Sequence, residues 1–182
     1  AHRDSKDLDL FTLEAYDWKS LNQVVNELAL ETNSKTEVKV KSNTYNEIYL
    51  ESEKEGWIQR IDFVHEQPIH FGEITVVDGI RVDSIENIGS NKVLTLYNRF
   101  EPKDYVDLYL ILQKTNWTFD QLFDLAKQKD AGLFEFYFAQ SLENLEKLEI
   151  LPVMKQAFDK EAMVKFYQNL QEKLLRQIKP AE

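Results

Sequence analysis

The spacing of apolar residues changes near Asp83, and this change limits the fold more than any other feature of the chain. Before it, apolar and polar residues alternate in short segments such as Asp7-Leu8-Asp9-Leu10, the pattern of a strand with two different faces. After it, apolar residues recur every three or four positions, as in amphipathic helices. This order predicts an α+β chain, with a mixed β-sheet core in residues 1–83 and a helical bundle packed on it in residues 84–182.

The first part is expected to hold one helix and several strands. The helix begins after Asp17, a favourable N-cap, and has one apolar stripe, made by Leu21, Val24, Val25 and Leu28. Asp78-Gly79 is a typical hairpin turn. The predicted strands are residues 7–13, 36–41, 47–51, 57–64, 72–77 and 80–82.

The second part is expected to be helical throughout. Ser84 and Thr118 are N-cap residues, and Pro102 suits the first position of a helix. The last helix has its apolar side on Met163, Phe166, Leu170, Leu174 and Ile178. The predicted helices are residues 84–98, 103–114, 118–129, 133–148 and 159–178.

Composition excludes several classes of protein. The chain has 182 residues and is 43% hydrophobic, enough for a folded core. It has no cysteine, so disulfides and thiolate metal sites are excluded and a cytoplasmic location fits. No apolar run approaches the roughly 18 residues that span a bilayer, so no membrane association is expected. The net charge of −10 argues against a protein that coats nucleic acid by bulk charge.

Three carboxylates are placed where they could bind metal ions. Asp7 and Asp9 point to the same side of their strand, and Asp62 points away from the apolar side of its own strand. If the two strands are adjacent, the three carboxylates could hold two divalent ions for a phosphoryl displacement. The alternative is a solvated sheet face on which Asp62 pairs with Arg60.

A second charged group lies in the predicted helices. Lys92 and Arg99 are two helical turns apart and therefore share a face, and Lys103, Asp104 and Asp107 follow in the next helix. Cations on a helix pair could grip a triphosphate. The alternative is ordinary surface charge, in which Lys103 and Asp107 form an i, i+4 ion pair.

These two segments together resemble a known family. The segment His2-Arg3-x-Ser5-x-Asp7-x-Asp9-Leu10-Phe11 resembles the HRxSxDxDLF motif of the AbiEii/AbiGii-type nucleotidyltransferase toxins, in the DNA polymerase β-like minimal nucleotidyltransferase superfamily. The later segment is similar to a second motif of that family, in the same order: Asp83, Ile88, Lys92, Arg99 and Lys103-Asp104-x-x-Asp107-Leu108. The resemblance covers residues 2–115.

The resemblance implies a Mg²⁺- or Mn²⁺-dependent enzyme that transfers a nucleotide from an NTP to an acceptor, RNA such as tRNA. Its members act as toxins in toxin–antitoxin or phage-defence (abortive infection) systems, so an antitoxin partner is implied. Asp7, Asp9 and Asp62 would be metal ligands, with Asp104 and Lys92 as further catalytic residues. The nucleotide would be bound by Ser5, Lys92, Arg99, Lys103 and Asp107.

The sequence departs from the family in one respect. The family has a glycine-rich GGT segment just before the His-Arg pair, whereas this sequence begins at Ala1. Gly89-Ser90 is not its equivalent, because it lies inside a predicted helix. Three interpretations are open: an active nucleotidyltransferase, a catalytically silent member that binds a nucleotide or a partner protein, and a structural interaction domain whose acidic residues have no chemical role.

Overall fold

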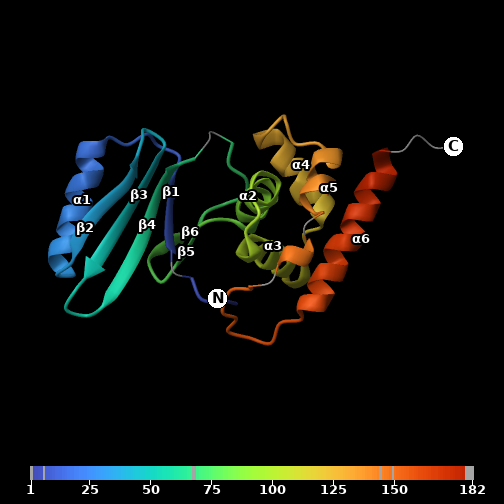
Figure 1. Cartoon of the computed structure of the whole chain (residues 1–182). Coiled ribbons are helices and arrows are strands. Elements are labelled where there is room, and N and C mark those ends of the chain that lie inside the picture. The colour runs from blue at the N-terminus through green and yellow to red at the C-terminus, as the bar shows by residue number, and fades with distance from the viewer. Residues whose placement is uncertain (1, 6, 67–68, 144, 149, 179–182) are drawn as a thin grey trace. The chain divides into compact units, whose positions relative to one another are not determined.

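The structure divides into two compact units. It is a computed structural model that describes residues 2–5, 7–66, 69–143, 145–148 and 150–178. Ser5–Ile69 form one unit, here called the sheet unit, and Ala1–Asp4 with His70–Glu182 form the other, here called the helical unit (Figure 1). The α+β class is confirmed, because the chain forms a mixed sheet and six α-helices among the described residues. A domain division at residues 83 and 84 stays a prediction.

The sheet unit is a four-stranded mixed sheet with one helix on one face. The strands lie in the order β1-β4-β3-β2, and β1 runs parallel to β4 while the other neighbours are antiparallel. Leu21, Val25 and Ala29 of the helix form a buried core with apolar residues of the two central strands. The elements are β1 (Asp7–Thr12), α1 (Trp18–Glu31), β2 (Lys35–Lys41), β3 (Tyr45–Ser52) and β4 (Trp57–His65).

Local sequence explains the start of α1 and its place against the sheet. The Asp17 carboxylate accepts a hydrogen bond from the backbone N–H of Ser20 at 3.0 Å, which satisfies one of the exposed donors at the helix start. Leu21 and Val25 lie one turn apart on the buried stripe. Burial of this stripe orients the sheet, because the opposite face is left for polar residues.

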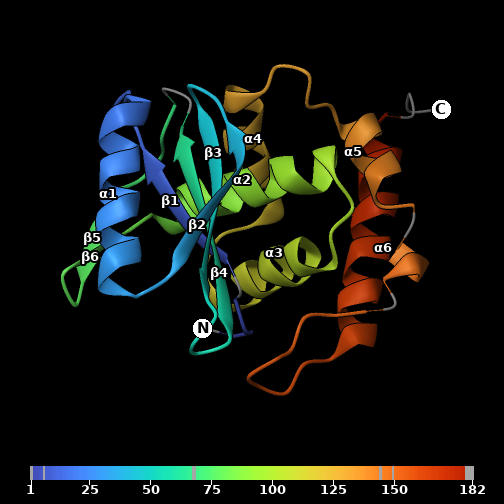
Figure 2. The same cartoon turned by 60° about the vertical axis from the view of Figure 1, so that its left-hand side comes forward.

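The helical unit begins with a hairpin and continues as a bundle. In the hairpin, Asp78 and Gly79 both have positive φ, 52° and 80°, as a type I′ turn requires. Helix α2 packs against α3 and α4, and α5 packs against α6 (Figures 1 and 2). The elements are β5 (Thr75–Val77), β6 (Ile80–Val82), α2 (Ile85–Asn98), α3 (Pro102–Lys114), α4 (Phe119–Lys129), α5 (Glu135–Ser141), a 3₁₀ turn (Leu145–Lys147) and α6 (Lys160–Ile178).

Two element predictions are corrected by the structure. A continuous helix over 133–148 is wrong, because α5 ends at Ser141 and a 3₁₀ turn follows. The apolar residues Leu142, Leu145 and Leu148 recur every third position, which suits a 3₁₀ turn, and all three are buried. The strand predicted from Gly72 begins only at Thr75.

Gly89-Ser90 lies inside α2, as predicted. Helices α2 and α4 approach each other closely at Gly89. A Cβ atom at Gly89 would lie 2.7 Å from one methyl carbon of Leu122 and 2.8 Å from the other. The Leu122 side chain is fully buried, so it has little room to move. The packing of α2 on α4 therefore depends on the absence of a side chain at this position.

We expect Gly89→Ala to destabilise the helical unit. Alanine is favoured over glycine in a helix by about 1 kcal/mol, but overpacking costs about 1–3 kcal/mol, so the net loss of unfolding free energy is at most about 2 kcal/mol. Urea unfolding measures it. In a Leu122→Val background the same substitution should cost less. An equal cost in both backgrounds would mean that contact with Leu122 is not the cause.

Among the described residues, no helix has both the length and the apolar character needed to cross a bilayer.

Candidate active site

The carboxylates of the sheet unit share one face. The register of the parallel pair places Asp9 opposite Asp62 and Asp7 opposite Arg60. Side chains opposite each other in a ladder leave the same face, so Asp7, Asp9 and Asp62 all lie on that face. Ile61 leaves the other face and is buried in the core with α1. Alternation along the two strands predicted this arrangement, and the role of the three residues as metal ligands stays a prediction.

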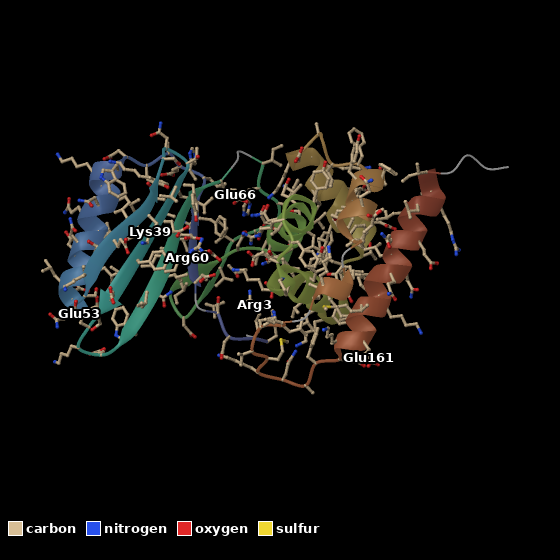
Figure 3. All side chains as sticks on the ribbon, viewed as in Figure 1. Arg3, Lys39, Glu53, Arg60, Glu66 and Glu161 are labelled. Carbon is tan, nitrogen blue, oxygen red and sulfur yellow. The ribbon has the colours of Figure 1, made fainter. Side chains whose placement is uncertain are left out.

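Arg60 lies on β4 of the sheet unit (Figure 3). On this face it forms an ion pair with Asp62. Its Nε and Nη2 donate to the two oxygens of Asp62 at 2.9 and 2.8 Å. The Asp62 residue is only 7% exposed. The Asp62–Arg60 pair of the alternative interpretation is present, but Asp62 is buried and not solvated as that interpretation expected. Hydrogen bonding to Asp62, working against burial, raises the pKa of Arg60, so this cation stays charged at every accessible pH.

The sequence did not reveal Glu47 and Tyr45 as neighbours of this pair. Glu47 on β3 is the register partner of Asp62, and its Oε2 lies 3.2 Å from Nη2 of Arg60. The Tyr45 hydroxyl donates to Glu47 at 3.0 Å and accepts from Arg60 at 3.0 Å. Burial, followed by the bond to Glu47, raises the pKa of Tyr45 to about 12. Only the strand register, which the sequence does not state, brings these residues together.

The donor chemistry of this face fits a hard divalent cation. Asp9, Asp62 and Glu47 lie in a row across three adjacent strands, and Asp7 follows Asp9 on the same face of β1. Carboxylate oxygens are the ligands that Mg²⁺ and Mn²⁺ prefer. Both oxygens of Asp62 already accept hydrogen bonds from Arg60. A metal ion bound by Asp62 would therefore share the carboxylate with Arg60 or displace the Arg60 side chain.

A second charged network lies in the helical unit and is centred on Lys92 of α2. Its Nζ lies 2.7 Å from Oδ1 of Asp104 and 2.8 Å from Oδ2 of Asp107. Asp104 is fully buried and Asp107 is 6% exposed. One ammonium group is therefore held between two carboxylates, both presented by the first turns of α3.

Three further side chains complete the network. Arg99 donates from Nε to Oδ2 of Asp104 at 3.0 Å and so meets the same carboxylate as Lys92. The prediction that the two cations share a helix face is wrong, because α2 ends at Asn98 and Arg99 is its C-cap residue, with extended backbone. Arg3 donates from Nε and Nη2 to the two oxygens of Asp107 at 2.7 and 2.8 Å. Nε2 of His2 lies 2.7 Å from Oδ1 of Asp107. In the sequence, His2 and Arg3 stood out only as part of the family motif. Their contacts with Asp107 could not be predicted, because Asp107 lies about a hundred positions away in the chain.

Opposite charges hold both Lys92 and Asp107 in their ionised forms. Burial alone would lower the pKa of Lys92, but the charges of Asp107 and Asp104 outweigh burial and raise it. Burial would likewise raise the pKa of Asp107, but the hydrogen bonds from Arg3 and the charge of Lys92 hold it well below its usual value. With His2 neutral, the network of Lys92, Arg99, Arg3, Asp104 and Asp107 carries one net positive charge, a suitable surface for phosphate oxygens.

We expect the Asp107 contribution to stability to disappear in acid. Because its folded pKa lies below the unfolded value of about 3.9, stability is fully present above that value and is lost as pH falls below it. Urea unfolding of wild type and Asp107→Asn between pH 7 and pH 3 measures this. The stability advantage of the wild type should shrink toward pH 3. A constant difference would show that folding does not lower the pKa of Asp107.

The remaining predicted residues lie beside these two groups. Ser5 lies at the start of the sheet unit, where its hydroxyl donates to the backbone carbonyl of Asp7 at 3.2 Å. Lys103 is the second residue of α3 and directly precedes Asp104. The structure thus joins Lys92, Arg99, Asp104 and Asp107 by direct contacts within the helical unit, and places Asp7, Asp9 and Asp62 on one face of the sheet unit.

Comparison with known proteins identifies the family of this chain. A protein-family model described as "Nucleotidyl transferase AbiEii toxin, Type IV TA system" matches residues 1–180. No curated protein matches the sequence.

Solved structures show a similar fold at low sequence identity. One is the crystal structure of a protein from H. pylori assigned as a nucleotidyltransferase, with a TM-score of 0.57, 17% identity, and coverage of 98% of this chain and 83% of that one. Another is JHP933 from Helicobacter pylori, with a TM-score of 0.55, 17% identity, and coverage of 96% and 79%. The family match over nearly the whole length establishes that this chain belongs to the AbiEii nucleotidyl transferase toxin family of type IV toxin–antitoxin systems.

Proposed function

We propose that this protein transfers a nucleotide from an NTP to an RNA acceptor such as tRNA, and that it acts in the cytoplasm as the toxin of a toxin–antitoxin or phage-defence system. The observation that carries the proposal is the shared face of Asp7, Asp9 and Asp62 on two paired strands, in a chain of the AbiEii family. In the reaction, a hydroxyl oxygen of the acceptor bonds to the α-phosphorus, the bond to the β-phosphate oxygen breaks, and pyrophosphate leaves.

The sheet unit would hold the metal. Asp7, Asp9 and Asp62 would bind Mg²⁺ or Mn²⁺, and Ser5 would lie beside the metal and the phosphates. When bound, the metal supplies a Lewis acid that polarises the phosphate oxygens and offsets the charge of the leaving pyrophosphate. Asp62 would complete the metal site or accept the proton of the attacking hydroxyl. Arg60 would neutralise whichever of Asp62 and Glu47 is not engaged, since it already contacts both.

The helical unit would bind the triphosphate. Lys92 would donate to phosphate oxygens with the third N–H of its ammonium, since the other two donate to Asp104 and Asp107. Arg99 is half-exposed and would add a second cation, and Lys103 a third. Asp104 and Asp107 would hold Lys92 in place. An antitoxin is the protein partner that such a system implies.

A catalytically silent, nucleotide-binding member of the same fold is the second candidate. It is favoured by one observation: Asp62 and Lys92, which should engage metal and phosphate, both have opposite charges as partners in this structure. In a silent member these ion pairs would be permanent and would serve stability.

Labelling with α-phosphate separates the two candidates. The full product of the gene is incubated with Mg²⁺, each of the four NTPs labelled at the α-phosphate, and total tRNA. Nucleotidyl transfer puts label into RNA, and omission of the divalent ion abolishes it. Binding of an NTP without label in any RNA, across all four nucleotides, would replace the enzyme by the silent binding member.

A further inference from the structure

The residues that open the chain form a short strap on the helical unit. Arg3 forms an isolated antiparallel bridge with Met154. The backbone N–H of Asp4 donates to the carbonyl of Val153 at 2.9 Å, and that of Lys155 donates to the carbonyl of His2 at 3.0 Å. The strap His2–Asp4 is therefore held by its backbone on one side, which fixes where its side chains begin.

The Arg3 side chain connects this strap to α3 (Figure 3). Its guanidinium makes a bidentate contact, here called the fork, with both oxygens of Asp107. The Arg3 side chain is only 16% exposed. A carboxylate rotates easily about its terminal bond, and a two-point contact with a planar guanidinium removes that freedom. The fork therefore decides which oxygen of Asp107 is presented to Lys92.

We propose that Arg3 is a positioning residue for the triphosphate site, where its fork on Asp107 fixes the carboxylate that orients Lys92. This inference rests on the proposed function. Lys92 contacts one oxygen of Asp104 and one of Asp107, an arrangement that leaves one of its three N–H groups for a ligand. Without the fork, His2 alone contacts Oδ1 of Asp107, and this single contact leaves the carboxylate able to rotate and offer both of its oxygens to Lys92. Such a rotation would draw the ammonium away from the substrate.

Arg3 also sets the charge of the network. Lys92, Arg99 and Arg3 are balanced against Asp104 and Asp107, so loss of Arg3 leaves no net charge when His2 is neutral. Arg3→Ala removes both the fork and the charge. Arg3→Lys keeps the charge but not the fork, because an ammonium has no planar pair of donors. The two variants separate positioning from simple electrostatic attraction.

Lys155→Ala is the matched control. Lys155 lies on the segment that the strap pairs with, and its side chain contacts Asp4 in an exposed ion pair at 3.0 Å. The substitution changes the charge by the same amount as Arg3→Ala and leaves the backbone hydrogen bond to His2 intact. It should not change nucleotide affinity or transfer.

The experiment measures NTP affinity with a fluorescent NTP and kcat and KM for transfer to RNA, with thermal unfolding of each variant. Arg3→Ala should weaken NTP binding about 10-fold and lower kcat by about 10–100-fold, by analogy with the loss of a partner that orients a metal-binding side chain. Arg3→Lys should recover most of the affinity but little of kcat. Wild-type affinity and kcat in a folded Arg3→Ala would overturn the proposal, as would full recovery of kcat in Arg3→Lys.

Separate measurements of NTP binding and of nucleotidyl transfer distinguish failure of the proposed function from failure of the inference about Arg3. A wild type that binds NTP but transfers nothing ends the proposed function, while weaker NTP binding by Arg3→Ala still supports the role of Arg3. A wild type that transfers, with an Arg3→Ala variant that is folded and equally active, ends the inference and leaves the proposed function intact. If Arg3→Ala does not fold, Arg3→Lys and Arg3→Gln are compared instead. If kcat falls in proportion to thermal stability in all variants, Arg3 has a purely structural role and the proposal is overturned.

Discussion

Replacing Asp9 by asparagine is expected to lower the rate of nucleotidyl transfer on the order of 10³-fold while leaving the fold intact. A metal ion contributes several kcal/mol of charge stabilisation in such a reaction, and each 1.4 kcal/mol is a factor of about ten. Asp9 lies opposite Asp62 on the polar face of the sheet, so its loss removes one of two facing carboxylates. Asparagine has the same shape, and the residue is exposed, so thermal unfolding should change little.

Glu51→Gln is the control for this prediction. Glu51 is an exposed carboxylate on β3 of the same sheet, and its removal changes the charge equally. Its transfer rate should equal that of the wild type. Electron paramagnetic resonance measures the binding of Mn²⁺, which should be weaker in Asp9→Asn than in the wild type and unchanged in Glu51→Gln. Equal transfer by both variants would exclude Asp9 as a metal ligand.

The second large effect concerns stability. Asp104→Ala should lower the free energy of unfolding by about 3 kcal/mol, because it leaves Lys92 without one of two partners and Arg99 without the carboxylate that it contacts. Asp104 is fully buried, so no water replaces the lost contacts without rearrangement. The value is at the low end for a buried ion pair, because the Arg99 side chain is half-exposed and can be solvated.

Urea unfolding of Asp104→Ala beside Asp120→Ala tests this. Asp120 pairs with Lys173 at the surface, where both side chains are about half-exposed. Loss of that pair and of a charge at the start of α4 should cost less than about 1 kcal/mol. Similar losses for the two variants would show that the buried network does not stabilise the helical unit.

The sequence by itself determined the elements whose signals are local. Alternation in Asp7-Leu8-Asp9-Leu10 specifies a strand with the two carboxylates on one side, and the structure has β1 there. The N-cap at Asp17 and the capping box at Thr118 begin the predicted helices, because a helix start depends on residues three positions apart. The fold class followed from these local patterns, and the family was recognised from motif letters in the same segments.

Only the tertiary structure decided which distant residues meet. The pairing of Asp9 with Asp62, and of Asp62 with Glu47, depends on strand order and register, which alternation leaves open. The contact of Arg3 with Asp107 joins residues about a hundred positions apart, and no periodicity connects them. Tertiary packing also decided the end of α5 at Ser141. Burial of Leu142, Leu145 and Leu148 in the helical unit outweighed the continuous helical pattern that the sequence favoured.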